Sequence, residues 1–268
     1  PDIHDGVHNA RKAFKKERGL LRLARYDLDK SVYKEMNAWF RDAKDRLSSA
    51  RDAEAMIETF DQLAERYPSV SESESLRAVR ESLVERREAI TSDDEALTQT
   101  AHELSRELAD FSDRTKQWEF SRGGFDGLAR GLERVYRQGR QAMKKAYQDP
   151  SDERFHDWRK RVKDYWYHSR LLRNVWPEMM KPLVAELKQL SDLLGDDHDL
   201  AVLPSTLADD RDKLQGDIDT LACLASKRQQ ELRSEARALG ARIYAEKPDC
   251  LVGTLGGHWK AWKKRKSV

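Results

Sequence analysis

The chain has 268 residues, of which 38% are hydrophobic and 37% charged, and its formal net charge is only +2. Apolar residues recur throughout, which excludes a disordered chain, and no apolar run approaches the roughly 18 residues that a membrane span needs. The two cysteines, Cys223 and Cys250, lack metal-ligand spacing. They predict neither a zinc site nor a disulfide framework, and they indicate a reducing, cytoplasmic location.

Helix is the predicted structure along the whole chain, because Gly and Pro are scarce and no segment shows sustained alternation of apolar and polar residues. The predicted interruptions are Pro68, Gly123-Gly124, Pro150, Pro177, Pro204, Pro248 and Gly256-Gly257. Helices are predicted over residues 5–27, 30–50, 51–66, 71–91, 94–119, 125–148, 151–174, 178–195, 199–209, 211–242 and 248–265. The sequence therefore predicts an all-α fold without strands.

An internal repeat divides the chain. Residues 7–12 (VHNARK) match residues 155–160 (FHDWRK) at an offset of 148, and residues 47–52 (LSSARD) match 194–199 (LGDDHD) at an offset of 147. Two matches at nearly one offset predict two structural copies, over residues 1–120 and 121–268. Only the second copy has a basic helix, at 125–147, before its His-containing helix. We expect a corresponding helix to precede the first residue of this sequence.

Three rows of basic residues recur at steps of three and four, which places each row on one face of a helix. The first cationic row is His8, Arg11, Lys12, Lys15, Arg18 and Arg22. The second cationic row is His156, Arg159, Lys160, Lys163 and Arg170, with Tyr167 among them. The third cationic row, on the preceding helix, is Arg130, Arg134, Arg137, Arg140 and Lys144. The opposite faces are apolar, including Phe14 and Trp158, and are predicted to pack in the core.

Such rows indicate an anionic ligand with several charges. Like charges four residues apart cost a helix about a few tenths of a kcal/mol per pair, so folding does not favour them. Binding of phosphate groups does favour such rows. Arg offers a planar fork to phosphate oxygens, Lys offers a point charge, and His offers a donor whose charge depends on pH. We predict that the first two rows face one shared groove, with the third as another wall.

The residues of the second cationic row, His156-x-x-Arg159-Lys160-x-x-Lys163-x-x-x-Tyr167, and their earlier copy resemble the CHAD family, the conserved histidine α-helical domain. The paired segments Arg51-Asp52 and His198-Asp199 are similar to a second landmark of that family. The resemblance implies two four-helix bundles related by pseudo-two-fold symmetry, with a basic central cavity. It also implies binding of inorganic polyphosphate without catalysis, at cytoplasmic polyphosphate granules.

Two metal-dependent alternatives remain open. Glu153-x-x-His156 and Asp5-x-x-His8 have the spacing of a di-metal centre in a helical bundle, although their rows continue into Arg and Lys, which would repel a cation. Residues 196–199 (DDHD) could serve a phosphohydrolase, but adjacent residues on a helix face different directions. Helix capping by Asp199 is the simpler interpretation of that segment.

Two further alternatives are a nucleic-acid or general polyanion-binding protein and a purely structural scaffold. The basic tail over residues 260–266, with Trp259 and Trp262, suits a phosphodiester backbone. The net charge of +2 argues against a broad duplex footprint, so nucleic acid is not the expected partner.

Overall fold

The computed structural model describes residues 3–47, 49–68, 74–91 and 94–266. Within these residues the fold consists of ten α-helices and one short 3-10 helix, with no strand, which confirms the all-α prediction. The helices are α1 (Ile3–Ala24), α2 (Lys30–Arg46), α3 (Ser49–Arg66), α5 (Glu74–Thr91), α6 (Asp94–Thr115), α7 (Gly124–Gln148), α8 (Asp152–Leu172), α9 (Pro177–Thr206), η1 (Ala208–Asp210), α10 (Arg211–Ile243) and α11 (Pro248–Lys266). None of the described helices has the length and apolar composition that crossing a membrane requires.

Two predicted interruptions are wrong. The two helices predicted over 178–195 and 199–209 form the single helix α9, with Pro204 in its last turn. The joining segment stays helical because Asp197 and Leu200 are buried there, and Arg233 binds the Asp197 carboxylate. Gly256 and Gly257 lie inside α11. Burial of Leu255 beside them offsets the helix cost of glycine, about 1 kcal/mol per residue.

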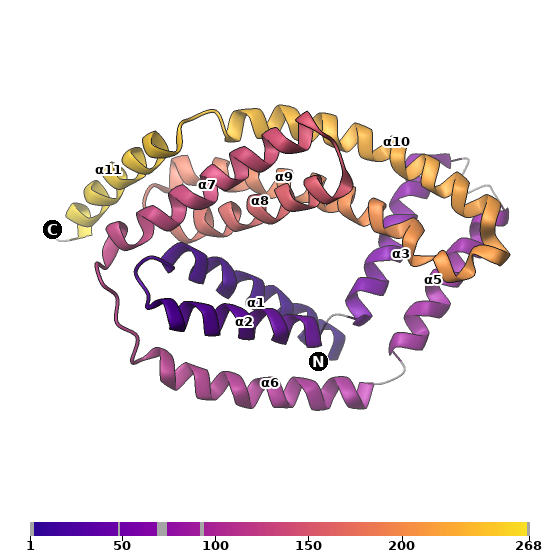
Figure 1. Cartoon of the computed structure of the whole chain (residues 1–268), viewed down its shortest axis with the longest axis horizontal. Coiled ribbons are helices and arrows are strands. Elements are labelled where there is room, and N and C mark those ends of the chain that lie inside the picture. Colours follow the sequence, from indigo (N-terminus) through magenta and orange to yellow (C-terminus); the bar gives the residue numbers. More distant parts are fainter. Residues whose placement is uncertain (1–2, 48, 69–73, 92–93, 267–268) are drawn as a thin grey trace.

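The described part of the chain has three hydrophobic cores (Figure 1). One joins α7, α8 and α11 with the first half of α9 and the second half of α10. Another packs α3 and α5 on the remaining halves of α9 and α10. The last joins α1, α2 and α6. The second of these cores combines residues from both predicted copies, so the hydrophobic packing does not divide at residue 120, and the two-bundle arrangement stays a prediction.

Helix α1 lies beside both α7 and α8, which brings the two His-containing helices together (Figure 1). The buried ring of His168 on α8 makes a hydrogen bond of 2.8 Å through Nε2 with the carbonyl oxygen of Gly19 on α1. Helix α7 crosses α1 at Gly131, where a Cβ atom would lie 2.0 Å from the carbonyl oxygen of Leu23. Only glycine permits this close backbone approach.

Replacing Gly131 with alanine is expected to destabilise the protein by about 1–3 kcal/mol, because the new methyl group must push α7 away from the backbone of α1. Chemical unfolding measures this change. The matched control is Gly253→Ala in α11, where a Cβ meets nothing within 4 Å. That control should be neutral or slightly stabilising. Equal stability of both variants would contradict the close approach.

Candidate anion-binding site

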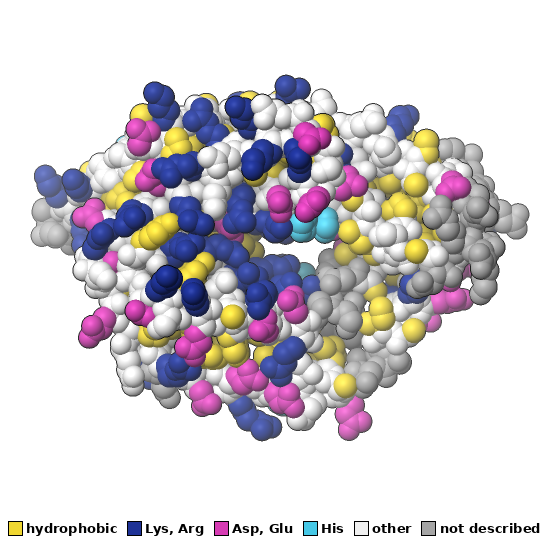
Figure 2. Space-filling view, in the orientation of Figure 1, with side chains coloured by type: hydrophobic (Ala, Val, Ile, Leu, Met, Phe, Trp, Pro, Cys, Tyr) yellow, Lys and Arg dark blue, Asp and Glu magenta, His cyan; other side chains and the backbone are white. Residues whose placement is uncertain are grey.

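A cavity of about 680 Å³ lies between α1, α8 and α9, with α2, α3 and α5 completing its walls. Figure 2 shows the molecule hollowed at its centre, with Lys, Arg and His side chains around the opening. Among its described lining residues, ten are Lys or Arg and two are Asp. The lining is therefore strongly cationic although the whole chain is nearly neutral.

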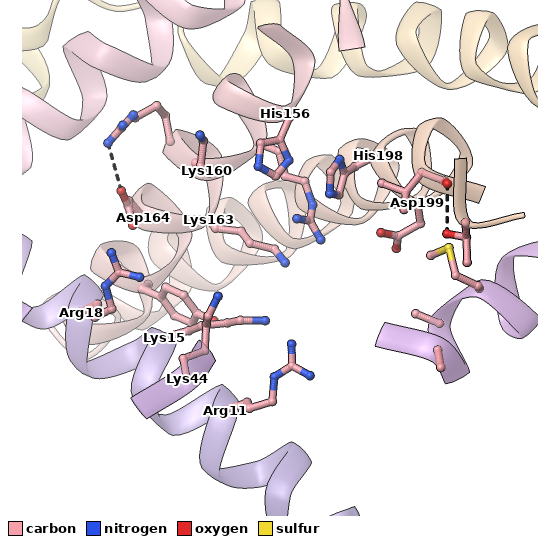
Figure 3. Close-up of a pocket in the computed structure, with 18 of the residues that line it drawn as sticks. Arg11, Lys15, Arg18, Lys44, His156, Lys160, Lys163, Asp164, His198 and Asp199 are labelled. Carbon is pink, nitrogen blue, oxygen red and sulfur yellow. Dashed lines mark hydrogen bonds and ion pairs between the residues drawn. The ribbon is translucent and has the colours of Figure 1, made fainter. Parts of the chain in front are cut away.

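Eight of the predicted site residues line this cavity. They are Arg11, Lys15, Arg18, Arg22, His156, Arg159, Lys160 and Lys163. The first four come from α1 and the others from α8, so the first two cationic rows contribute to the same space. In Figure 3 the side chains of Lys15 and Lys44 point into it from one side and those of Lys163 and His156 from the other.

The other predicted site residues do not line the cavity: His8, Lys12, Arg130, Arg134, Arg137, Arg140 and Arg170. Lys12 is exposed and His8 half-buried. The guanidinium of Arg170 lies 4.8 Å from the ring centre of Trp166. The third cationic row is no wall of the cavity, because α7 turns that face toward the end of α1 and toward solvent. Binding of phosphate by these seven residues stays a prediction.

Several lining residues are outside the predicted set: Lys44, Arg86, Arg161, Tyr167, His198 and Asp199. Lys44 on α2 and Arg86 on α5 belong to no cationic row, so periodicity could not reveal them. His198 had a signal, since it lies in the repeated segment over residues 194–199. Its ring centre lies 4.0 Å from that of His156, which joins α9 to α8 at one end of the cavity.

Helix α8 holds its side chains in place through its first turn. Ser151 caps the helix, with its Oγ accepting a hydrogen bond of 3.3 Å from the amide of Arg154. Asp152 and Glu153 place negative charge at the positive end of the helix dipole. One turn on, Phe155 and Trp158 are buried in the core, and this fixes the rotation of the helix so that His156 and Arg159 face the cavity.

Burial controls the protonation of the two histidines. Burial, followed by the charges of His198 and Lys160, lowers the pKa of His156 to about 4. Burial and the charge of Arg159 lower the pKa of His198 to about 4 as well. Both rings are therefore neutral near pH 7 while the cavity is empty.

The pKa of Lys163 is strongly shifted. Burial, with the positive charges of Arg159 on α8 and Lys15 on α1, lowers its pKa to about 7. Within the described residues its ammonium forms no ion pair. The charges of Asp199 and Asp192 act in the opposite direction but do not outweigh burial and the neighbouring cations.

Asp164 neutralises part of the lining. Its carboxylate lies 2.6 Å from Nη1 of Arg22 and 3.5 Å from Nη1 of Arg161. Its own side chain is only 6% exposed, so it binds these two guanidinium groups from inside the α1–α8 contact. Arg22 and Arg161 are therefore already paired. Arg159 is not: its buried Nε has no hydrogen-bond partner among the described residues, and neither has Nδ1 of His156.

The side chains of the acidic segment at residues 196–199 point in different directions from α9. Asp197 is buried and accepts a hydrogen bond of 2.6 Å from Arg233, whereas His198 and Asp199 line the cavity. Asp196 lines a separate pocket on the other side of α9. Asp199 lies in the middle of α9, so its interpretation as a helix cap is wrong. Among the described residues no group of three or more His, Cys, Asp or Glu could hold a metal ion; the side chains of Asp5 and Asp52 lie outside them.

The arrangement can hold an extended anion. Lys and Arg donors from α1 and α8 face the same space, and two buried nitrogens, Nε of Arg159 and Nδ1 of His156, lack partners among the described residues. A phosphate chain would supply oxygens to each of them, and buried polar groups gain most from such bonds.

Comparison with known families identifies one match. The family model for the CHAD domain matches residues 1–208. Every residue that lines the cavity lies within the matched stretch. No curated protein and no solved structure matches the chain.

Proposed function

Since this chain belongs to the CHAD family, we propose that it binds inorganic polyphosphate in the cavity between α1 and α8, without catalysis. The polyphosphate chain lies along the cavity, with its oxygens bound by Arg11, Lys15, Arg159 and Lys163. Lys44 and Arg86 extend this contact to α2 and α5. The proposal includes a cytoplasmic location at polyphosphate granules.

One observation carries the proposal: both copies of the repeated His-x-x-Arg-Lys-x-x-Lys segment supply cations to one cavity whose own carboxylates do not balance them. Cations so placed repel one another. Burial and this repulsion together lower the pKa of Lys163 to about 7. A polyvalent anion relieves the repulsion. We further propose that the two copies are related by pseudo-two-fold symmetry about this cavity, as in two facing bundles.

Calorimetric titration tests this function. The purified protein is titrated with long-chain polyphosphate, single-stranded DNA and pyrophosphate, each at about 50 and 200 mM salt. We expect tight binding of polyphosphate that weakens about a hundredfold or more over this salt range. By analogy with nucleic acids, each charge contact contributes somewhat under one unit to the slope of log affinity against log salt. Binding of DNA and of pyrophosphate should be much weaker.

Charge-neutral variants locate the binding. The double variant Arg159→Gln with Lys163→Gln should lose affinity and show a shallower salt dependence. The matched control is Arg173→Gln with Lys181→Gln, which removes the same charges from exposed positions outside the cavity. Equal affinity for DNA would make the protein a general polyanion binder. Unchanged affinity and slope in the folded cavity variant would refute this site.

A further inference from the structure

A second cationic cluster lies outside the cavity, where α7 crosses the end of α1. Arg25 and Tyr26 directly follow α1, and Arg130 and Arg134 are one turn apart on α7. The guanidinium carbons of Arg25 and Arg130 lie 5.1 and 4.7 Å from the ring centre of Tyr26. Nη1 of Arg134 donates a hydrogen bond of 3.2 Å to the Tyr26 hydroxyl. We call these four residues the Tyr26 cluster.

The two carboxylates that follow Tyr26 in the sequence are already bound elsewhere. Asp27 is buried, and its two oxygens accept hydrogen bonds of 2.7 and 3.0 Å from the backbone amides of Arg122 and Gly123. Asp29 caps α2 through the amides of Ser31 and Val32.

Two acids share the face of the third cationic row, and neither forms an ion pair with the cluster: Glu133 pairs with Arg137 one turn along α7, and Asp126, one turn before Arg130, forms no ion pair within the described residues. Within the described part of the chain, Arg25, Arg130 and Arg134 form no ion pair with any carboxylate. Three guanidinium groups thus meet at one ring without a counter-ion.

Tyr26 holds these guanidinium groups in an arrangement suited to an anion. Burial acts to raise the pKa of its hydroxyl, but the hydrogen bond from Arg134 and the charges of the three arginines together lower that pKa. Stacking on the ring occupies the flat face of a guanidinium and leaves its N–H edge for another acceptor. The guanidinium carbon of Arg25 also lies 4.7 Å from the ring centre of a second tyrosine, Tyr33.

We propose that the Tyr26 cluster is a second binding site, which takes the phosphoryl groups of an oligophosphate. None of its four residues lines the cavity. Arg22 on α1, three residues before Arg25, does line it. Figure 2 shows Lys and Arg side chains gathered over the region where the first half of α7 lies beside α1, and continuing to the central opening. The ligand is either a separate short oligophosphate or a stretch of a chain whose remainder lies in the cavity. The proposal does not require that the cavity itself binds.

Titration of the full chain with sodium triphosphate tests this site. The wild-type protein should bind triphosphate in two events. The double variant Arg130→Gln with Arg134→Gln should lose one event and keep the affinity of the other. The matched control is Arg173→Gln with Lys181→Gln, which removes two positive charges from exposed positions outside the cavity, the cluster and the three cationic rows. The control should keep both events.

Each outcome of this titration bears on the site. If the cavity does not bind, the wild type shows a single event and the Arg130/Arg134 variant abolishes it, which supports this site and contradicts the cavity. If one long chain spans both sites, the variant loses about tenfold or more in affinity for long-chain polyphosphate, because the second contact is intramolecular. Unchanged affinity for that chain, with one triphosphate event lost, indicates a separate short ligand. Wild-type binding of triphosphate by the folded variant, or an equal loss in the control, would overturn the proposal.

Discussion

Replacing Lys163 with methionine is expected to stabilise the folded protein while weakening polyphosphate binding about tenfold or more. The side chain of Lys163 is half-buried beside Arg159 and Lys15, so its removal relieves both a desolvation cost and like-charge repulsion. Methionine retains an unbranched apolar side chain of similar length. The expected gain of about 1–2 kcal/mol corresponds to a rise of about 3–6 °C in Tm for a chain of this size. The loss of affinity reflects one missing charge-assisted contact.

The stabilisation should depend on pH in a definite direction. The pKa of Lys163 is about 7 in the folded protein and 10.5 in its ordinary state. The unfolded chain therefore binds more protons between these values, and the stability of the wild type rises with pH across that window. The full penalty is present below pH 7. The Tm difference between variant and wild type should be largest at about pH 6 and nearly absent at about pH 10.

A suitable control is Lys160→Met on the same helix. The side chain of Lys160 is 48% exposed, and its ammonium lies 2.5 Å from Asp157. Its removal should leave Tm nearly unchanged, since exposed pairs contribute about 0–1 kcal/mol. A lower Tm of Lys163→Met at pH 6 would mean that the ammonium is neutralised in the folded protein. A higher Tm with unimpaired binding would remove Lys163 from the site without affecting the account of its burial.

The helices and two of the three cationic rows could be predicted from periodicity alone. The spacing of His8 to Lys15 and of His156 to Lys163 requires only that each segment be helical, and apolar residues such as Phe14 and Trp158 determine the opposite face. The repeat then predicts that both rows serve one ligand. Most of these residues do line one cavity.

For the third cationic row, the spacing predicts the helix face but not the part of the fold that this face meets. Arg130 to Arg140 lie on one face of α7, as predicted, but a face does not reveal its neighbour. The close approach at Gly131 brings α7 against the end of α1, so this face meets Tyr26 and solvent instead of the cavity. Lys44 and Arg86 were missed for the converse reason, because each reaches the site alone through tertiary packing.

The protonation of the site also depends on burial, which the sequence does not report. A histidine in a basic row suggests an imidazolium that titrates near its ordinary pKa of 6.5, yet burial and neighbouring cations lower the pKa of both His156 and His198 to about 4. The same causes lower the pKa of Lys163 to about 7. The group that changes charge near neutral pH in the empty cavity is therefore a lysine.

Polyphosphate binding is accordingly expected to take up protons, and affinity should fall as pH rises from about 7 to 9. A bound polyanion favours the charged ammonium, so it raises the pKa of Lys163 above its value of about 7 in the empty cavity. Between the two pKa values the complex holds one more proton than the free protein. Log affinity then decreases by up to about one unit per pH unit in this window, or up to about a hundredfold from pH 7 to 9.

The histidines should add a second pH range in which polyphosphate binding takes up protons. A polyanion also raises the pKa of His156 and His198, whose values in the empty cavity are about 4. Up to two further protons are then taken up as pH falls toward 5. Calorimetry in buffers with different ionisation heats counts these protons directly. Long chains are preferred as ligand, because their few terminal phosphates contribute little to the count.

Two variants assign each pH range of proton uptake to the residues that cause it. Lys163→Met should abolish proton uptake near pH 8 and leave uptake near pH 5 intact, whereas His156→Gln with His198→Gln should have the opposite effect. Salt dependence must be measured at each pH, because a lost charge also reduces its slope. Uptake near pH 8 that persists in Lys163→Met would assign the titration to another group. Zero uptake at both pH values, with binding intact, would show that the polyanion contacts neither Lys163 nor the paired histidines, and would leave the arginines and the other lysines as its contacts.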